Sequence, residues 1–556
     1  MKKSFVRIFT VVLAMTLCLC IPSSALALGD TLNWGVYSAP KGFFMSGIYD
    51  AMYDLYVLEL TQDPLFLQDT KADEQVFRPR LAESWEVSED GMEYVFHLRS
   101  DVKWHDGEPF TADDVIFDFT SFCDYRMNAN NYLTMFSNIA GAPEYYEYTR
   151  ALSEGTEPET VVEGVSGLEK IDDYTFKITL GTFYAPFMTS LSNLNIFAKH
   201  IWEDIPIDTW RTCDTLKTPM GTGPYKFVKY EQDQYVTFEA NPDYYLGEPK
   251  IKNVVYKIVN QDTAQVELIN GDLDVVSMIS NPTKEVMDNY ENNGMNVLEF
   301  ADQGYQIMAI NTQVEKLADN TVRQAFCYAI NRQGMIDHLL NGHATLLNCP
   351  CYRDSWAYPD DLEEYAYNPE KAVELLNSIG WVDTDGDGVL DKDGEPFEVS
   401  LLCPTGNKVR EQSAVIIQQN LKDIGVTCDV ETMDFNTVME RASYSDNYEL
   451  ALIGWSVGID PDVFSMYHSS TQFLNDNNMA RYANLELDPL LEASAAEPNQ
   501  EKRGELFYQI FHILNQDIPM MMLYSPNEIR ASRPELVGYD CGNESEFINI
   551  QDWYFE

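Results

Sequence analysis

The chain has 556 residues, of which 45% are hydrophobic and 13% aromatic, and it carries a formal net charge of −52 at neutral pH. This length is ample for a large core but too long for one ordinary domain, so we expect two or three lobes. The acidic balance argues against nucleic acid and anionic membrane surfaces as partners, because both repel a polyanion.

The first residues have the composition of an export signal rather than of a folded element. Three basic residues precede an apolar stretch over 8–21, and Ala25-Leu26-Ala27 provides a cleavage site of small residues. The sequence therefore predicts a signal peptide over 1–27 and export to the periplasm or outer cell surface. Lipidation at Cys18 or Cys20 is the alternative, but a leucine precedes each cysteine where a lipoprotein signal has a small residue.

A hairpin, a turn and a capped helix follow one another between Arg78 and Phe119. The polar run over 88–91 ends in a glycine and is typical of a turn, and the residues over 94–98 then alternate with the period of a strand. A second turn lies over 104–107. Thr111 begins a helix whose first turn holds two aspartates, where the helix dipole favours carboxylates.

The whole run, RPRLAESWEVSEDGMEYVFHLRSDVKWHDGEPFTADDVIFDF, closely resembles the signature of the family 5 extracellular solute-binding proteins, which are the peptide- and nickel-binding components of ABC importers. Three further segments resemble the same family: PMGTGPYKF at 219–227, LINGDLDV at 268–275 and a helix over 320–332, with apolar Val322, Phe326 and Ile330 spaced for one face. The resemblance implies a two-lobed α/β fold of the type 2 periplasmic-binding-protein kind, with an extra domain inserted in the first lobe.

The same resemblance implies how the chain is divided and what it does. We expect lobe I over 28–72, 212–302 and 520–556, the extra domain over 73–211 and lobe II over 303–519. The implied function is a monomeric receptor that captures peptides between its lobes and delivers them to ABC transporter permease subunits, with no catalytic role and no required cofactor.

Other ligands and one other class of protein remain as alternatives. A nickel or other metal chelate is possible within the family, although the seven histidines form no cluster, and an oligosaccharide ligand is a further option because the fold does not fix the ligand. A secreted hydrolase is the enzymatic alternative. The sequence contains neither His-Glu-x-x-His nor Gly-x-Ser-x-Gly, so no catalytic residues are proposed.

The second lobe is expected to contain a β-α-β unit. Its strands lie over 399–403 and 425–430, with a helix over 413–421 between them. Cys403 and Cys428 fall on these two strands, and we expect them to be the disulfide pair. The methionine run that begins at Met520 is interpreted as a buried strand rather than a site for a soft metal ion.

An aspartate-rich loop has the spacing of a calcium-binding loop. Asp383, Asp385, Asp387 and Asp391 occupy positions 1, 3, 5 and 9, and a glycine occupies position 6. Gly394 stands at position 12, where a bidentate glutamate is expected. A structural calcium ion is therefore one interpretation, and a polar hairpin is the other, since Asp-Gly pairs favour tight turns.

The resemblance also places the second-lobe side of the ligand site. In the peptide binders of this family, a Gly-Trp pair is followed, three residues after the Trp, by an Asp that grips the peptide amino terminus. Here Trp455 follows Gly454, Gly458 stands at the Asp position, and the carboxylate comes two residues later, at Asp460. Trp455 is expected to contact ligand or to be a core residue, and Asp460 to bind the amine or to cap the following helix.

The remaining predicted contacts lie on the hinge side of the site. Tyr305 comes just after the expected crossover into lobe II, and the segment with Ser277, Met278 and Ser280 comes just before it. In relatives, the matching segment offers backbone groups to an extended peptide. These four residues are therefore predicted to line the ligand site.

Overall fold

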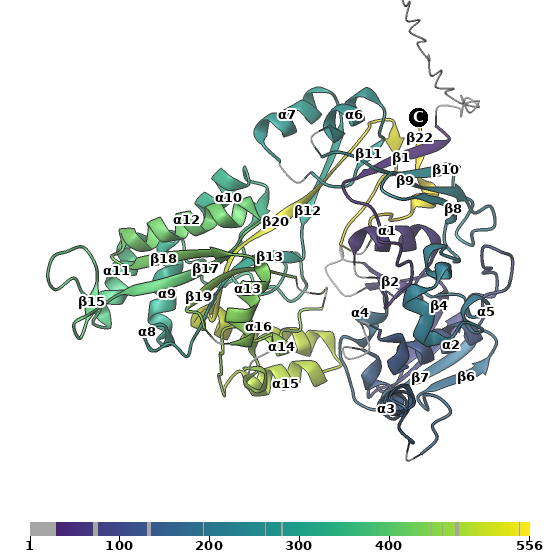
Figure 1. The fold of residues 1–556 in the computed structure, drawn as a ribbon, viewed down its shortest axis with the longest axis horizontal. Helices are drawn as coiled ribbons and strands as arrows, with labels where there is room; N and C mark the ends of the chain where they lie inside the picture. Colours follow the sequence, from purple (N-terminus) through teal and green to yellow (C-terminus); the bar gives the residue numbers. More distant parts are fainter. Residues whose placement is uncertain are drawn as a thin grey trace, which may run out of the picture.

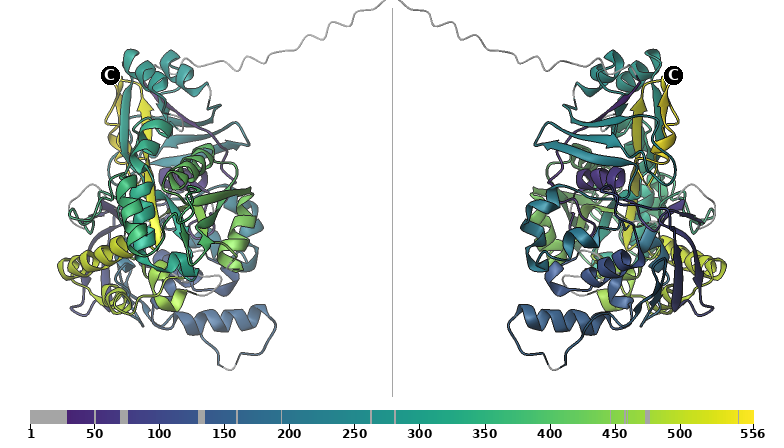
Figure 2. Two further views of the ribbon diagram at one scale, coloured as in Figure 1. Left: turned by 90° about the vertical axis from the view of Figure 1, so that its left-hand side faces the viewer. Right: turned by 90° about the vertical axis from the view of Figure 1, so that its right-hand side faces the viewer.

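The computed structural model describes residues 29–556 except for Asp50, 70–75, 130–134, Glu159, Asn193, Asp262, 280–281, Asp446, Val457, Ile459, 473–476 and Glu544. The predicted signal peptide, with Cys18 and Cys20, and Ser280 lie outside the described residues. Figure 1 shows two lobes side by side, and the two views of Figure 2 show the same body from its ends. The predicted two-lobed α/β fold is confirmed. No helix in the described part of the chain is both long and apolar enough to cross a bilayer.

The first lobe is built from the beginning, middle and end of the chain. Its elements are β1 (Thr31–Val36), α1 (Met52–Thr61), β8 (Tyr225–Glu231), β9 (Tyr235–Ala240), β10 (Asn253–Ile258), α6 (Ala264–Asn270), β11 (Val275–Val276), α7 (Lys284–Asn292), β12 (Asn296–Ala301), β21 (Leu536–Val537) and β22 (Tyr554–Phe555). Its core packs Trp34 of β1 against Tyr56 of α1 and Phe547 of the C-terminal tail. The tail is therefore part of this lobe.

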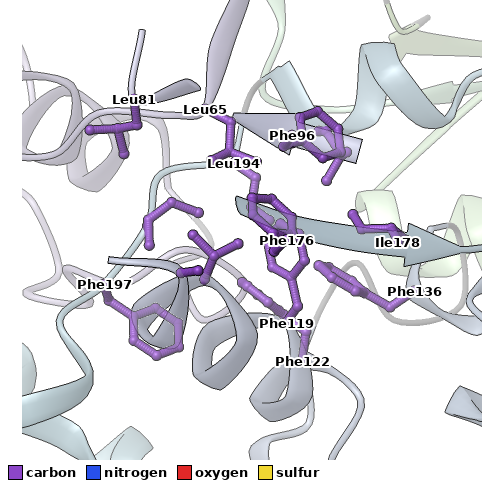
Figure 3. Close-up of a cluster of buried hydrophobic side chains, with 14 of the residues drawn as sticks. Leu65, Leu81, Phe96, Phe119, Phe122, Phe136, Phe176, Ile178, Leu194 and Phe197 are labelled. Atoms are coloured by element: carbon purple, nitrogen blue, oxygen red, sulfur yellow. The ribbon is translucent and has the colours of Figure 1, made fainter. Parts of the chain in front are cut away.

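An inserted four-stranded sheet, in the order β4-β5-β7-β6, lies below α1 in Figure 1. The elements of this region are β2 (Phe66–Asp69), β3 (Val76–Pro79), β4 (Ala82–Val87), β5 (Glu93–Leu98), α2 (Ala112–Phe122), α3 (Ala142–Ser153), β6 (Leu168–Asp172), β7 (Thr175–Thr179), α4 (Phe187–Ser192) and α5 (Lys199–Trp202). Figure 3 shows its phenylalanine-rich core, in which Phe96 and Phe176 stack at 5.0 Å.

The predicted hairpin and capped helix of this region are confirmed. Gly91 has φ +67°, the left-handed conformation that the turn between β4 and β5 requires. The backbone N–H of Thr111 donates to the Asp114 carboxylate at 2.9 Å, as expected at the start of α2.

Two of the segments that resemble the family lie against each other. The N–H of His105, in the second turn, donates to the Gly221 carbonyl at 2.9 Å, and its Nε2 lies 3.0 Å from the Gly223 carbonyl oxygen. The Lys226 ammonium group donates a hydrogen bond to the His105 carbonyl at 2.9 Å. Burial lowers the pKa of His105 to about 4, so the ring is a neutral structural group. These bonds join the inserted domain to lobe I.

The second lobe is built around its own part of a large sheet that is shared with lobe I. Its elements are β13 (Gly304–Ile310), α8 (Glu315–Ala318), α9 (Asn320–Ala329), α10 (Arg332–Leu339), β14 (Ala344–Thr345), α11 (Pro369–Ser378), β15 (Asp391–Lys392), β16 (Glu395–Pro396), β17 (Glu398–Pro404), α12 (Lys408–Asp423), β18 (Thr427–Met433), α13 (Phe435–Met439), β19 (Leu450–Ser456), α14 (Phe464–Tyr467), α15 (Asp488–Ala496), α16 (Gln500–Asp517) and β20 (Met520–Ser532). The predicted β-α-β unit is confirmed as β17-α12-β18. Its helix begins five residues earlier than predicted, because Asn407 caps it through the N–H of Arg410.

One twelve-stranded sheet runs through both lobes, with the main order β18-β17-β19-β13-β20-β11-β1-β10-β9-β8. β20 is the strand that joins the halves (Figure 1). Its first part pairs with β13, and its second part pairs with β11 and β12. The methionine run at its start is buried, as predicted, and packs in the cores of lobe II. The expected lobe boundary at 520 thus falls at the start of a strand that serves both lobes.

The expected disulfide between Cys403 and Cys428 is wrong. The two strands are adjacent, but Cys403 lies opposite Thr432 and Cys428 lies opposite Val399. This register separates the cysteines by four positions along the ladder, roughly 13 Å at the rise of a parallel strand, which is too far for a disulfide. Both thiols are free.

We predict that Gly221→Ala destabilises the protein. A Cβ at this position would lie 1.7 Å from the carbonyl oxygen of Thr61, at the end of α1, so the backbone must shift. The expected loss in the free energy of unfolding is about 1–3 kcal/mol, measured by denaturant titration. Gly164→Ala is the control, because nothing lies within 4 Å of its added Cβ. Equal stability of the two variants would contradict the close approach.

Candidate functional site

A cavity of about 580 Å³ lies between the lobes, beside the strands that join them. Its wall combines α1, the ends of β12 and β20, the C-terminal tail over 542–551, and Ser456 and Gly458 from lobe II. This volume is within the usual range of ligand pockets, roughly 300–1,000 Å³. A cavity lined by both lobes at their junction is suited to a ligand that holds them together.

Helix α1 supplies an amphipathic wall. Met52, Leu55, Tyr56 and Glu59 line the cavity and follow the i, i+3, i+4, i+7 spacing of one helix face. Met52 is 58% exposed, although it is a large apolar residue. This face therefore offers a ligand apolar surface, with a carboxylate at its end.

The joining strands supply a charged wall. Glu528 lies directly opposite Phe300 in the β12–β20 ladder, so these two side chains and Arg530, two positions along β20, share one face. Asp302 directly follows β12 and lines the cavity with them. Arg530 bonds Glu528 through Nη1 at 2.5 Å and Glu546 of the tail through Nε at 3.1 Å. Its guanidinium also lies 5.6 Å from the ring of Phe300.

Burial perturbs two carboxyl groups of this wall. It raises the pKa of Glu546 to about 7, although Arg530 acts in the opposite direction. Burial, together with the neighbouring Glu528, also raises the pKa of Asp302. Glu59 accepts bonds from the Ser545 hydroxyl at 3.0 Å and from the Glu546 N–H at 2.9 Å. The carboxylates of α1, β20 and the tail thus form one connected network.

A third carboxyl group whose pKa burial raises, that of Asp63, lies just after α1. Asp63 accepts hydrogen bonds from Tyr244 at 3.1 Å and Thr222 at 3.3 Å. Burial raises its pKa to about 6, against the opposing effects of Arg80 and of these two hydrogen bonds. Among the described residues, five acidic side chains and two arginines line the cavity: Glu59, Asp63, Asp302, Glu528, Glu546, Arg80 and Arg530.

Of the predicted hinge segment, Met278 lines the cavity. Its carbonyl accepts a hydrogen bond from the Tyr37 hydroxyl at 2.5 Å. Ser277 is buried, and its N–H bonds the Gly35 carbonyl at 3.1 Å. Ser277 therefore bonds to β1 just after the end of β11 and is not among the residues that line the cavity.

Tyr305 and Trp455 lie outside the cavity lining. They are opposite each other in the β13–β19 ladder. Tyr305 is only 1% exposed, with its hydroxyl 3.9 Å from the Met466 sulfur, and Trp455 packs on the same lobe II core. The residue after Trp455, Ser456, is the one that reaches the cavity. Trp455 is half-buried at the edge of that core, and its contact with ligand stays a prediction.

Asp460 is buried in an ion pair and does not line the cavity. Arg503 of α16 bonds both carboxylate oxygens of Asp460, at 2.5 and 2.8 Å, and both side chains are at least nine-tenths buried. Asp460 is not the helix cap either, since the N–H of Phe464, the first residue of α14, bonds the Asp462 carboxylate at 2.9 Å. The placement of Asp460 corrects both expectations for it.

The sequence did not predict that Asp302, Glu528 and Glu59 line the cavity. Asp302 and Glu528 are far apart in the sequence and are brought together only by the β12–β20 pairing. The one sequence signal that could have found Asp302 is its position at the predicted end of lobe I, where the chain crosses between lobes. No local pattern distinguishes Glu59, Glu528 or Arg530 from ordinary surface charges.

The aspartate-rich loop lies far along lobe II. Carboxylate oxygens of Asp383, Asp385 and Asp387 lie within 4.8 Å of one another, and all three side chains are exposed. Asp391 instead accepts bonds from the N–H and hydroxyl of Thr384, at 2.9 and 2.8 Å. A hairpin follows, in which β15 pairs with β16 around Asp393 and Gly394. The structure therefore contains the hairpin, and a calcium ion held by the three aspartates remains a prediction.

The buried ion pair predicts a structural role for Asp460. Asp460→Asn should lower the free energy of unfolding by about 3–5 kcal/mol, because it leaves the Arg503 guanidinium buried without its counter-ion. Ligand affinity of the folded variant should be unchanged. Asp360→Asn is the control, since Asp360 pairs with Arg353 but is 91% exposed, and it should not alter stability. A stable Asp460→Asn variant that no longer binds ligand would restore the amine-binding role.

The calcium prediction is tested by thermal melts with calcium and with a chelator. Calcium at a hundred times its dissociation constant should add about 2.7 kcal/mol to the free energy of unfolding. Asp385→Asn should abolish this difference because it removes a carboxylate from the cluster, whereas Asp393→Asn, in the adjacent hairpin, should retain it. Identical melts of the unmodified protein would leave only the hairpin.

Known proteins match the chain over nearly its full length. The oligopeptide-binding protein AppA of Bacillus subtilis is 30% identical over 495 residues, which cover 87% of this chain and 85% of AppA. The structure of AppA with a nonapeptide has a TM-score of 0.70 and 27% identity, with 95% of this chain and 99% of that chain covered. The structure of NikZ from Campylobacter jejuni with Ni(L-His) has a TM-score of 0.71 and 27% identity, covering 94% and 99%.

The family of bacterial extracellular solute-binding proteins, family 5 (middle region), matches residues 76–476. This range contains the hairpin and capped helix, the contact between His105 and the glycine segment, and most of the second lobe. Members of the family are non-catalytic receptors of ABC importers. The chain belongs to family 5 of the bacterial extracellular solute-binding proteins.

Proposed function

We propose that this receptor captures peptides in the cavity between its lobes and delivers them to the permease of an ABC importer. The observation that carries the proposal is the chemistry of the cavity wall, which alternates apolar and aromatic side chains with carboxylates and two arginines. A peptide has the matching composition, because it carries charged termini, backbone polar groups and varied side chains. The likeness to AppA, whose structure holds a nonapeptide, supports the same ligand class.

A metal chelate is the second candidate, because the NikZ structure holds Ni(L-His). Nickel prefers imidazole ligands. Neither histidine nor cysteine is among the described residues that line the cavity. The wall of this cavity therefore favours a peptide over a nickel complex.

The location of the cavity is consistent with capture by closure. The lobes also meet away from the hinge, where the Ala185 N–H of the inserted domain donates to the Ala495 carbonyl of lobe II at 3.3 Å. A ligand that contacts both lobes favours the state in which this contact is made, since only that state offers all of its binding groups. Closure then reports the presence of ligand to the permease.

The proposal predicts that peptide copurifies with the protein. Native mass spectrometry of the freshly purified protein should show bound species that release peptides on denaturation. After the protein is unfolded, dialysed and refolded, isothermal titration calorimetry should show binding of short peptides and none of Ni(L-His). Release of a metal complex or a saccharide in place of peptide, with no peptide binding by the refolded protein, would contradict the proposal.

A further inference from the structure

The carboxylates around Arg530 outnumber the cations that face them. Glu528 and Glu546 share the single guanidinium of Arg530. Glu59 accepts hydrogen bonds from the Ser545 hydroxyl and the Glu546 N–H of the tail. Asp302 has no lysine or arginine nitrogen within 4 Å among the described residues. Three carboxylates, those of Asp302, Glu528 and Glu546, therefore face one guanidinium on this side of the cavity.

This surplus is costly while the cavity holds no cation. Like charges a few ångströms apart repel strongly where burial excludes water. The raised pKa of Asp302 reflects both burial and the charge of Glu528. A positive group placed beside these two side chains would relieve the repulsion and would gain charge-assisted hydrogen bonds.

An independent observation also points to a missing donor. Gln62 lines the cavity three residues after Glu59, and it is 3% exposed. Its Nε2 donates to the Met220 carbonyl at 3.2 Å, which fixes the orientation of the amide. Its Oε1 is buried and has no hydrogen-bond donor among the described residues. A buried acceptor of this kind is normally satisfied, so a donor from the ligand is expected here.

Aromatic side chains complete the environment of a cation. Tyr49, Tyr56 and Phe300 line the same cavity. Phe300 already contacts the Arg530 guanidinium at 5.6 Å, so its ring face is in use as a cation partner. Tyrosine rings attract ammonium and guanidinium groups in the same way.

We propose that the acidic wall of the cavity, formed by Asp302 and Glu528 in the same lining as Glu59 and Gln62, binds a cationic group of the ligand. This inference rests on the proposed peptide function and narrows it to peptides that present an ammonium or guanidinium group at this wall. The group is either the peptide amino terminus or a lysine or arginine side chain. In this proposal the acidic wall is the counter-ion of the ligand. Asp460 does not have this role, because Arg503 already neutralises it.

Four pentapeptides separate these sources: Ala-Ala-Lys-Ala-Ala and Ala-Ala-Gln-Ala-Ala, each with a free and an N-acetylated amino terminus. Calorimetry with the refolded protein should show that the acetylated glutamine peptide, which has no cationic group, binds at least tenfold more weakly than the tightest of the other three. A loss on acetylation alone assigns the wall to the amino terminus. A loss on replacing lysine alone assigns it to a side chain.

The double variant Asp302→Asn/Glu528→Gln should reduce this preference to less than twofold. The matched control is Asp214→Asn/Glu86→Gln, which makes the same charge change at side chains that are 97% and 78% exposed and should keep the preference. Unfolding curves show whether each variant is folded. If a variant does not fold, the four peptides still show whether the unmodified protein prefers a cationic ligand.

Equal affinities of the unmodified protein for all four peptides, or tighter binding of the acetylated glutamine peptide, would overturn the inference and leave the peptide function intact. No binding of any of the four would overturn the peptide function, and the inference with it.

Discussion

Strand β20 pairs with strands of both lobes, and this pairing determines where the lobes meet and where the cavity forms. Its first residues complete the sheet of lobe II beside β13, and its last residues complete the sheet of lobe I beside β11 and β12. The register with β13 shifts between Gln306 and Ile307, near the crossover. Because backbone hydrogen bonds continue across the junction, the lobes are tied at one edge and the cavity forms beside that edge.

The same pairing explains why the cavity is charged. Antiparallel partners point their side chains to the same side of a ladder, so β12 and β20 present Phe300, Glu528 and Arg530 together, and Asp302 directly follows β12. The C-terminal tail then adds Glu546, which bonds Arg530. A charged ligand group bound here contacts the joining strands directly, and any movement of the lobes about those strands alters its surroundings.

The sequence predicted best those features that depend on neighbours in the chain. The turn before β5, the capped start of α2 and the β17-α12-β18 unit follow from alternation, capping residues and glycines. The helix expected from Asn320 through Arg332 is an instructive exception. α9 ends at Ala329, and Asn331 caps a new helix, α10, by accepting the Gly334 N–H at 2.8 Å. A local apolar spacing continued across a break that one polar side chain creates.

The candidate site was predicted poorly because its contacts are not local. The resemblance correctly identified the family and correctly predicted that Met278 lines the cavity. It could not show that Arg503, on α16, neutralises Asp460. The register between strands was also not predictable from the sequence. Cys403 and Cys428 are on adjacent strands, as expected, but four positions apart along the ladder. Asp302 and Glu528 come together at the cavity only because β12 and β20 pair. Sequence patterns specify elements, whereas the site depends on how distant elements are registered.

A crystal structure of the protein with its copurifying ligand would show whether the ligand lies against the acidic wall. The ligand should occupy the cavity beside β12 and β20, with a nitrogen cation within hydrogen-bond distance of the Asp302 or Glu528 carboxylate and with Asp460 still bound to Arg503. A ligand held against Trp455 and Asp460, with Arg503 displaced and the acidic wall without a ligand contact, would contradict the proposal.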